Sequence, residues 1–173
     1  MSGNVLWITG LSGAGKTTLG GEVVGLLRSA GKSVVFLDGD DLRDVFVLPH
    51  INQDNHSRER RIQLAIQYSQ LCKMLSTQGL IVVIATISLF HEVHAWNRTH
   101  IPGYIEIYLN VPLDELRRRD PKNIYQKYDN GELSNVAGLD LHVDVPKNPD
   151  KVIEFDSKNF NASIANDLLK LLP

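Results

Sequence analysis

Short apolar runs alternate along the chain with longer stretches in which apolar residues recur at helical spacing. Five runs rich in β-branched and aromatic residues predict strands at residues 5–9, 33–37, 80–85, 104–109 and 152–155. The helical spacing predicts helices at residues 19–29, 57–78, 89–99, 112–119 and 163–172. Because strands and helices alternate, the pattern predicts one three-layer α/β domain over residues 1–173 with a five-stranded parallel sheet.

Two of these elements carry a further expectation. Residues 80–85 form the strongest predicted strand, and we expect this strand at the centre of the sheet. The helix at residues 19–29 contains Gly20, Gly21 and Gly25, each of which costs a helix roughly 1 kcal/mol relative to alanine. We expect these glycines to allow close packing of the helix against the sheet.

Composition and charge narrow the class of protein. The 173 residues are 43% hydrophobic and carry a net charge of −2, so no basic face for nucleic acid is evident and we expect no such partner. The longest apolar run, residues 80–87, is too short to cross a bilayer, and no signal peptide is visible, so we expect no membrane partner. The single cysteine, Cys72, excludes a disulfide within the chain and is expected to be a buried, unreactive thiol. These features favour a cytoplasmic protein.

A glycine-rich segment follows the first predicted strand. Residues 10–18 read Gly-Leu-Ser-Gly-Ala-Gly-Lys-Thr-Thr and match G-x-x-x-x-G-K-[ST], the phosphate-binding loop, between a strand and a helix. The glycines let a polyphosphate lie against bare backbone N–H groups, and the helix start favours an anion. Lys16 is placed to reach the β- and γ-phosphates, and the Thr17 hydroxyl can ligate Mg²⁺. The predicted nucleotide-binding residues are Gly10, Ser12, Gly13, Ala14, Gly15, Lys16, Thr17 and Thr18.

Acidic residues follow the second predicted strand, at the edge where open parallel sheets bind ligands. Asp38, Asp40 and Asp41 stand there, and Arg43 follows. Carboxylates beside a phosphate site can contact Mg²⁺ or accept a hydroxyl proton, and we favour Asp40 for both roles. The alternative is that Asp40 or Asp41 caps the helix that follows.

Two predicted helices carry clustered basic residues or histidines. Arg58, Arg60 and Arg61 stand in the first turns of the long helix, where positive charge opposes the dipole, so either an anionic ligand lies close or the patch is solvated. His91 and His94 are spaced to share a metal, but no thiol pair or obvious third ligand accompanies them. We favour a substrate contact or ordinary surface histidines.

Two stretches lack a clear pattern. Residues 119–140 are charged and rich in tyrosine and glycine, which predicts a mobile cover over the site rather than part of the core. Residues 45–55 contain Pro49 and several polar side chains and are expected to be irregular.

Several segments together resemble one family, the adenylylsulfate (APS) kinases, which have the P-loop kinase fold. The matching segments occur in the family's order and span nearly the whole chain, and as a set they are specific. They are residues 10–18, residues 37–40 with Arg43, residues 87–88, residues 119–122 with Tyr125, residues 131–132 and residues 138–140.

The resemblance implies a homodimeric, ATP- and Mg²⁺-dependent kinase that phosphorylates the ribose 3′-hydroxyl of a small nucleotide. It implies that Lys16 and Thr17 hold phosphate and Mg²⁺, that Asp40 lies near the acceptor hydroxyl, and that Arg119 lies in the region covering ATP. Ser88 matches a serine that is phosphorylated in some members, and we include it among the catalytic candidates. The predicted acceptor contacts are Asp38, Asp40, Arg43, Arg58, Arg61, Ile87, Ser88, Lys122 (which begins the lid), Val136 and Leu139.

Departures from the family pattern concentrate on the acceptor side. The usual Phe-Thr-Gly-Ile-Asp, whose phenylalanine stacks on the acceptor's adenine, reads Val-Ala-Gly-Leu-Asp at residues 136–140. A lost base–aromatic stack costs on the order of 1–3 kcal/mol. The usual Phe-Ile-Ser-Pro-Tyr/His-Arg reads Thr-Ile-Ser-Leu-Phe-His at residues 86–91. An arginine is missing at residues 54–61, and the loop before the long helix lacks the family's Gly-Phe-Ser.

A smaller base, or a different group on the 5′-phosphates, fits these departures. Some APS-kinase-like enzymes of surface-polysaccharide pathways act on cytidine diphosphoramidate, and both acceptors stay open at this point. A GTPase would need a guanine-reading Asn-Lys-x-Asp, which we do not find. A non-catalytic ATP-binding regulator is the alternative of another class, and the presence of Asp40, Arg43 and Arg119 disfavours it.

Overall fold

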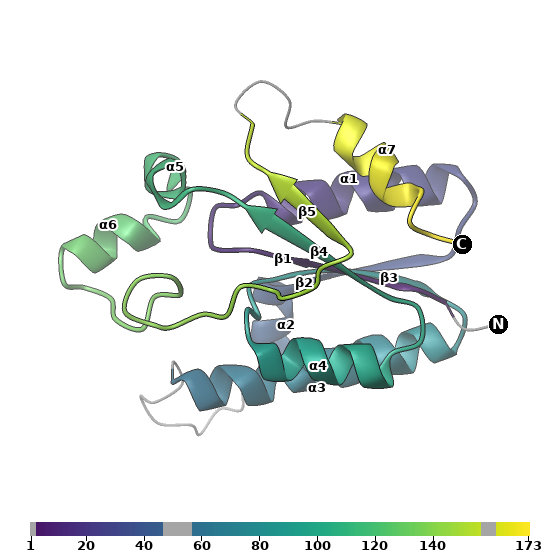
Figure 1. Ribbon diagram of the computed structural model, residues 1–173, viewed down its shortest axis with the longest axis horizontal. Helices are drawn as coiled ribbons and strands as arrows, with labels where there is room; N and C mark the ends of the chain where they lie inside the picture. Colours follow the sequence, from purple (N-terminus) through teal and green to yellow (C-terminus); the bar gives the residue numbers. More distant parts are fainter. Residues whose placement is uncertain (1–2, 47–56, 157–161) are drawn as a thin grey trace.

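The computed structural model describes residues 3–46, 57–156 and 162–173. Its sheet holds five parallel strands in the order β2-β3-β1-β4-β5 (Figure 1). The strands are β1 (Val5–Thr9), β2 (Val34–Asp38), β3 (Ile81–Thr86), β4 (Tyr104–Asn110) and β5 (Lys151–Glu154). The predicted fold class is confirmed, and all five strands lie within one or two residues of their predicted bounds.

The middle strand is β1 and not β3. In the register, Ile8 of β1 lies between Ala85 of β3 and Ile107 of β4. The expectation that residues 80–85 lie at the centre is therefore wrong, although β3 is an interior strand. Burial on both faces is shared by the interior strands, so an apolar run cannot tell which of them is the middle one.

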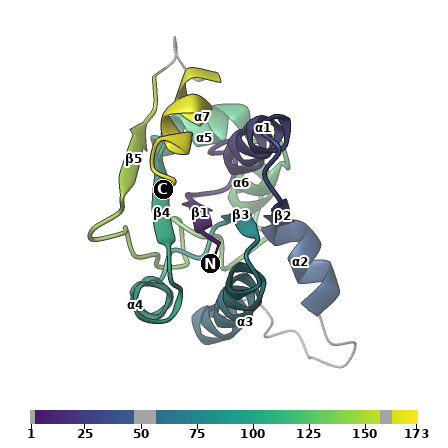
Figure 2. The ribbon, with the colours of Figure 1, turned by 90° about the vertical axis from the view of Figure 1, so that its right-hand side faces the viewer.

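Helices cover both faces of the sheet, as the end-on view shows (Figure 2). Helices α1, α5 and α7 lie on one side, and α3 and α4 on the other. The bounds are α1 (Lys16–Ser29), α2 (Gly39–Phe46), α3 (Arg58–Thr77), α4 (His91–His100), α5 (Leu113–Arg119), α6 (Ile124–Asp129) and α7 (Ala162–Leu169). The expectation that residues 45–55 are irregular is wrong for Val45 and Phe46, which belong to α2, and residues 47–55 lie outside the described residues.

Alternate side chains of β1 fill two cores, because successive side chains of a strand point to opposite faces. Leu6 and Ile8 belong to the core under α1 and α7. Val5 and Trp7 belong to the core under α3 and α4, together with Cys72. Burial raises the pKa of the Cys72 thiol to about 12, which confirms the prediction of a buried, unreactive cysteine.

The carboxyl ends of the strands face the segment that links α5 to β5 (Figure 1). Residues 119–140, which we call the lid segment, contain α6, a helix that the sequence pattern did not predict. The carboxylate of Asp120 accepts hydrogen bonds from the backbone N–H groups of Tyr125 and Gln126, at 3.2 and 2.9 Å, and so caps this six-residue helix. Tyr125 is 1% exposed and belongs to the first core, so the expectation that the whole segment lies outside the core is wrong.

In the described ranges, no helix combines the length and the apolar character that crossing a membrane requires.

The three glycines of α1 differ in their surroundings. A Cβ on Gly20 would lie 2.6 Å from Cε2 of Phe36 in β2, so this glycine allows close packing, as expected. A Cβ on Gly21 or Gly25 would meet nothing within 4 Å, so the same expectation is wrong for these two.

Gly21→Ala should therefore raise the free energy of unfolding by about 1 kcal/mol, because alanine suits an open helical position better. Gly20→Ala should give no such gain, because its methyl group must displace the Phe36 ring. Urea denaturation of both variants measures the difference. Equal stabilisation by the two substitutions would contradict the packing role of Gly20.

Candidate active site

A cavity of about 1440 Å³ opens at the carboxyl edge of the sheet. Single-ligand pockets are typically about 300–1,000 Å³, so the space suits two ligands side by side. Its walls come from the glycine-rich loop, the ends of β2 and β3, one face of α3 and the lid segment. The predicted site residues in these walls are Ser12, Gly13, Gly15, Lys16, Thr17, Thr18, Asp38, Asp40, Arg43, Arg61, Ile87, Ser88, Arg119, Lys122 and Val136.

The glycine-rich loop turns sharply between β1 and α1. Gly13 and Gly15 have φ angles of 78° and 96°, which residues with a side chain rarely adopt. Helix α1 begins directly after them at Lys16, so its free N–H groups face the cavity, where an anion is favoured.

Lys16 is held inside this loop. Its ammonium group donates a hydrogen bond of 2.8 Å to the Leu11 carbonyl. Burial, with a smaller contribution from the positive charge of Lys122, lowers the pKa of Lys16 to about 8. Among the described residues no carboxylate forms an ion pair with this ammonium group, which favours a bound anion in the cavity.

Two carboxylates stand at the end of β2. The Thr17 hydroxyl donates to Oδ2 of Asp38 at 2.7 Å, which ties the loop helix to this strand end. Oδ1 of Asp38 accepts the backbone N–H of Asp40 at 2.9 Å. The capping role considered for Asp40 or Asp41 thus falls to Asp38, and the Asp40 side chain is directed elsewhere.

Asp40 is surrounded by positive charge. Its carboxylate forms an ion pair with Lys122 of the lid segment and lies 3.4 Å from Arg43. Burial opposes ionisation, but Lys122 and, to a smaller extent, Arg43 and Lys16 outweigh it and keep the pKa of Asp40 below its ordinary value. The side chain is therefore ionised near pH 7 and can accept a hydrogen bond from a hydroxyl group.

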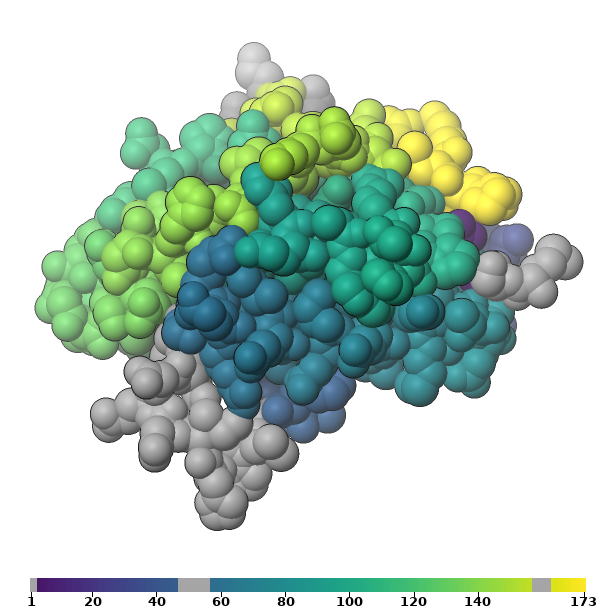
Figure 3. All heavy atoms as spheres, turned by 60° about the horizontal axis from the view of Figure 1, so that its bottom comes forward, coloured from purple at the N-terminus to yellow at the C-terminus, as the bar shows by residue number. Residues whose placement is uncertain are grey.

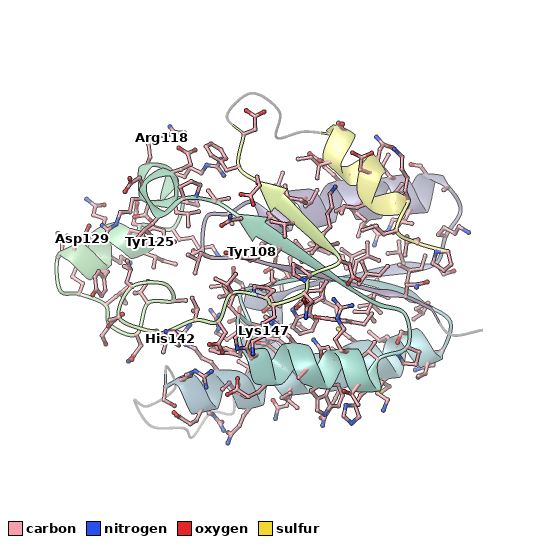
Figure 4. The ribbon with its side chains drawn as sticks, viewed as in Figure 1. Tyr108, Arg118, Tyr125, Asp129, His142 and Lys147 are labelled. Atoms are coloured by element: carbon pink, nitrogen blue, oxygen red, sulfur yellow. The ribbon has the colours of Figure 1, made fainter. Side chains whose placement is uncertain are left out.

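Arg119 closes the cavity on the loop side. Its guanidinium group lies 4.8 Å from the centre of the Phe155 ring, donates to Glu115 at 2.7 Å, and reaches the Gly13 carbonyl at 3.4 Å. Tyr125 adds a second link, because its hydroxyl donates to the Ser12 carbonyl at 2.9 Å. Figure 4 labels Tyr125 and Asp129 on α6, which lies at the edge of the sheet where the strands end. The lid segment is thus fastened directly to the phosphate-binding loop.

A tight turn of the lid segment forms the opposite wall. Asp140 accepts the backbone N–H groups of Asn135 and Val136, each at 2.7 Å, and Arg61 of α3 donates to the Asn135 carbonyl at 2.8 Å. These bonds fix Val136 and Ala137 in the cavity wall. Ala137 itself pairs with Leu141 in an isolated β-bridge.

Ser88 stands where β3 leaves the sheet. It is 7% exposed, has a φ angle of 25°, and shares a hydrogen bond of 2.8 Å with the Thr86 hydroxyl. Both Ile87 and Ser88 contribute to the cavity wall.

Four of the predicted site residues lie outside the cavity wall: Gly10, Ala14, Arg58 and Leu139. Gly10 and Ala14 support the loop from behind, since a Cβ on Gly10 would lie 2.9 Å from the Leu109 carbonyl oxygen and 3.4 Å from Cβ of Ala14. Leu139 packs against the first core.

Arg58 makes ion pairs outside the cavity. Its guanidinium group binds Glu92 through two hydrogen bonds of 2.9 and 3.1 Å and Asp144 at 2.8 Å. Asp144 also accepts the backbone N–H of His91 at 3.0 Å and so caps α4. Figure 3 shows the amino-terminal part of α3, α4 and the chain after the lid segment in contact on this face. Arg58 therefore joins three segments, and acceptor binding by Arg58 stays a prediction.

The two histidines of α4 have different surroundings. His91 hydrogen-bonds the Val145 carbonyl through Nε2 at 3.0 Å and is partly exposed. His94 is 6% exposed and bonds the Ser88 carbonyl, so the interpretation as a surface histidine is wrong for it. Among the described residues, no group of three or more His, Cys, Asp or Glu side chains is arranged to hold a metal.

Comparison with known proteins identifies the family. The sequence profile described as "Adenylylsulphate kinase" matches residues 2–154. The chain belongs to the adenylylsulphate kinase family.

The chain is similar to kinases that are named for different substrates. It is 39% identical over 155 residues to the cytidine diphosphoramidate kinase of Campylobacter jejuni, a match that covers 90% of this chain and 88% of that protein. It is 34% identical to the adenylyl-sulfate kinase of a Picosynechococcus strain, over 98% of this chain and 93% of that one. Since its relatives are kinases, this member of the adenylylsulphate kinase family is a phosphotransferase.

The fold agrees with this assignment. The structure of the Mycobacterium tuberculosis APS kinase in complex with AMPPNP and APS superposes with a TM-score of 0.86 at 29% identity, covering 98% of this chain and 97% of that one. AMPPNP is an ATP analogue, so this neighbour supports the use of ATP by the family member described here.

Several residues of the cavity were missed by the sequence analysis. They are Phe36, Phe46, Gln63, Gln67, Tyr68, Phe90 and Asn135. A signal was present for two of them, because Gln63 and Gln67 follow Arg60 at spacings of three and seven on one helix face. The aromatic residues carried no such signal, because the sequence pattern cannot distinguish a core side chain that also borders a cavity.

The buried Lys16 gives a measurable signature. At pH 8, binding of ATP should take up about half a proton, because the phosphates stabilise the charged form of a lysine whose pKa is about 8. Calorimetry in buffers of different ionisation enthalpy measures this uptake, and Lys16→Met should abolish it. Uptake that persists in Lys16→Met would assign the proton to another group.

Proposed function

We propose that this protein transfers the γ-phosphate of ATP to the ribose 3′-hydroxyl of a cytidine diphosphate derivative, of the cytidine diphosphoramidate type. The observation that carries the proposal is a contrast within one cavity. Lys16, Thr17, Asp38 and Asp40 form a complete phosphate-binding side, whereas the opposite wall presents Val136 where related kinases have a base-stacking phenylalanine.

On the donor side, the loop N–H groups and Lys16 bind and polarise the γ-phosphate. For this, Lys16 exchanges the Leu11 carbonyl for phosphate oxygens. Arg119, which packs on the Phe155 ring, lies at the loop side of the cavity wall and borders the space for the rest of ATP.

Mg²⁺ fits the oxygen donors of this site. Thr17 and Asp38 lie within 2.7 Å of each other and Asp40 is ionised, so these three side chains would hold the ion directly or through water. The chemistry that a bound Mg²⁺ would supply here is neutralisation of the negative charge on the phosphates. Two or three protein ligands suffice, because Mg²⁺ keeps several waters and binds phosphates.

On the acceptor side, Asp40 orients the 3′-hydroxyl. The hydroxyl oxygen forms a bond to the γ-phosphorus as the bond to the departing ADP oxygen breaks, and the hydroxyl proton passes to the Asp40 carboxylate. Arg43 contacts the acceptor phosphates, and Lys122 moves from Asp40 to phosphate oxygens. The lid segment excludes water, which would otherwise hydrolyse ATP.

The choice of acceptor rests on the wall formed by the turn at residues 135–137. A valine offers no face for stacking, which removes about 1–3 kcal/mol of binding to an adenine. The similarity to the Campylobacter jejuni enzyme, at 39% identity, supports a cytidine nucleotide.

APS is the second candidate acceptor. The family profile and the M. tuberculosis complex with APS favour it. We further propose that the protein acts as a homodimer in the cytoplasm, with residues 1–173 as one domain, on the basis of the resemblance to APS kinases.

A panel of acceptors tests the proposal. With ATP and Mg²⁺, we expect phosphate transfer to a cytidine diphosphate derivative roughly tenfold more efficiently than to APS, because the roughly 1–3 kcal/mol of one lost stack corresponds to a factor of about 5 to 150. Mass spectrometry of the products measures it. A strong preference for APS would overturn the choice of acceptor, and binding of ATP without transfer to any acceptor would indicate a regulator.

Val136→Phe should shift the preference toward APS by roughly tenfold, because it restores an aromatic face at the acceptor wall. The ratio of kcat/KM for the two acceptors measures the shift. Val145→Phe is the matched control, because Val145 is 58% exposed and lies outside the cavity wall. An unchanged ratio in Val136→Phe would show that this turn does not select the base.

A further inference from the structure

The backbone of Ile87 and Ser88 forms part of the cavity wall in an unusual conformation. Ser88 is not a glycine, yet its φ angle is 25°, a value that a side chain disfavours. Such a conformation persists only where neighbouring groups hold it. Four hydrogen bonds contribute here. Thr9 donates to the Ile87 carbonyl, and the Thr86 and Ser88 hydroxyls share one bond. The Ser88 carbonyl accepts from both the His94 ring and the Phe90 N–H.

The bond from His94 fixes the state of its ring. Nε2 lies 3.0 Å from the Ser88 carbonyl oxygen, which can only accept, so Nε2 carries the proton. Burial lowers the pKa of His94 to about 4, so the ring is neutral near pH 7 and Nδ1 carries no proton.

A buried polar cluster lies on the other side of the ring. Nδ1 of His94 lies 3.4 Å from Oε1 of Glu106, a residue of β4 that is 2% exposed. Glu106 in turn accepts from the Tyr104 hydroxyl and from Arg98, each at 3.3 Å. The buried imidazole therefore stands between β4 and the cavity wall, and its hydrogen bond through Nε2 to Ser88 is directed at that wall.

We propose that His94 is a positioning residue for the acceptor, because its Nε2–H holds the Ser88 carbonyl and thereby sets the Ile87–Ser88 wall of the cavity. The inference rests on the proposed function, in which this wall borders the acceptor. His94 touches neither ligand and acts through the backbone that it holds. A displacement of about 1 Å at such a wall is enough to lower the rate of a positioned reaction strongly.

Three variants test the proposal. His94→Leu removes one of the two donors to the Ser88 carbonyl and leaves only the Phe90 N–H, and we expect kcat/KM for the acceptor to fall roughly tenfold as the wall shifts. The KM for ATP should change less than about twofold, since the loop that binds ATP is shaped by its own glycine turns and by the bond from Lys16 to Leu11. His94→Gln can place an N–H near the position of Nε2 and should recover activity to within about threefold of the wild type.

His91→Gln is the matched control on the same helix, because His91 bonds Val145 outside the cavity wall, and its activity should equal that of the wild type. Thermal unfolding of all the variants provides the second readout. If His94→Gln is as impaired as His94→Leu at equal stability, or if neither variant is impaired, the positioning role is wrong.

A readout without turnover separates this inference from the proposed function. Long-range ¹H–¹⁵N spectra of the wild type at pH 7 should show His94 neutral with its proton on Nε2, and a proton on Nδ1 would overturn the inference. If the wild type phosphorylates no acceptor while His94 shows the expected tautomer, the proposed function fails and the hydrogen bond to Ser88 stands.

Discussion

The site depends on the fixed end of β1. Every residue of this strand is buried, and the strand is paired with β3 on one side and β4 on the other. The glycine-rich loop that follows therefore starts from a position fixed by packing and by hydrogen bonds on both sides. The loop then needs glycines to bring its N–H groups toward one point, and α1 begins there with Lys16. Because the strands are parallel, the ends of β2 and β3 reach the same edge and supply Asp38 and Ser88 without long connections.

Carboxylates that accept hydrogen bonds from backbone N–H groups determine the conformation of the lid segment and of the residues that follow it. Asp120 caps α6, Asp140 closes the turn that carries Val136, and Asp144 caps α4. Only a few side chains of this part, such as Tyr125, reach the core. Its order therefore comes from local hydrogen bonds, which allows the sequence of the acceptor wall to change while the sheet stays the same.

The fold and the phosphate side could be predicted from the sequence because each rests on a local signal. Apolar runs mark strands, and the glycine-lysine motif marks its own loop. The acceptor side could not be predicted in the same way. Arg58 and Arg61 lie three residues apart in α3 and carry the same guanidinium group. Nevertheless Arg58 binds Glu92 of α4, whereas Arg61 reaches the cavity. Which of them faces the ligand depends on the path of segments more than thirty residues away.

His94 and α6 show the same limit. A histidine in a polar helix resembles a surface residue until the fold brings Ser88 and Glu106 to its two ring nitrogens. Helix α6 has six residues, too few for a periodic pattern, and it depends on a cap from Asp120.

In the proposed reaction, Lys122 of the lid segment competes with the acceptor hydroxyl for the Asp40 carboxylate, because the two side chains form an ion pair. The carboxylate cannot bind the ammonium group at full strength and receive a hydroxyl proton at the same time. Any molecule that enters must therefore displace a cation whose local concentration is set by a short tether and not by supply in solution. An acceptor that brings its own phosphates gives Lys122 a new partner as it arrives, whereas a water molecule or a neutral sugar offers none.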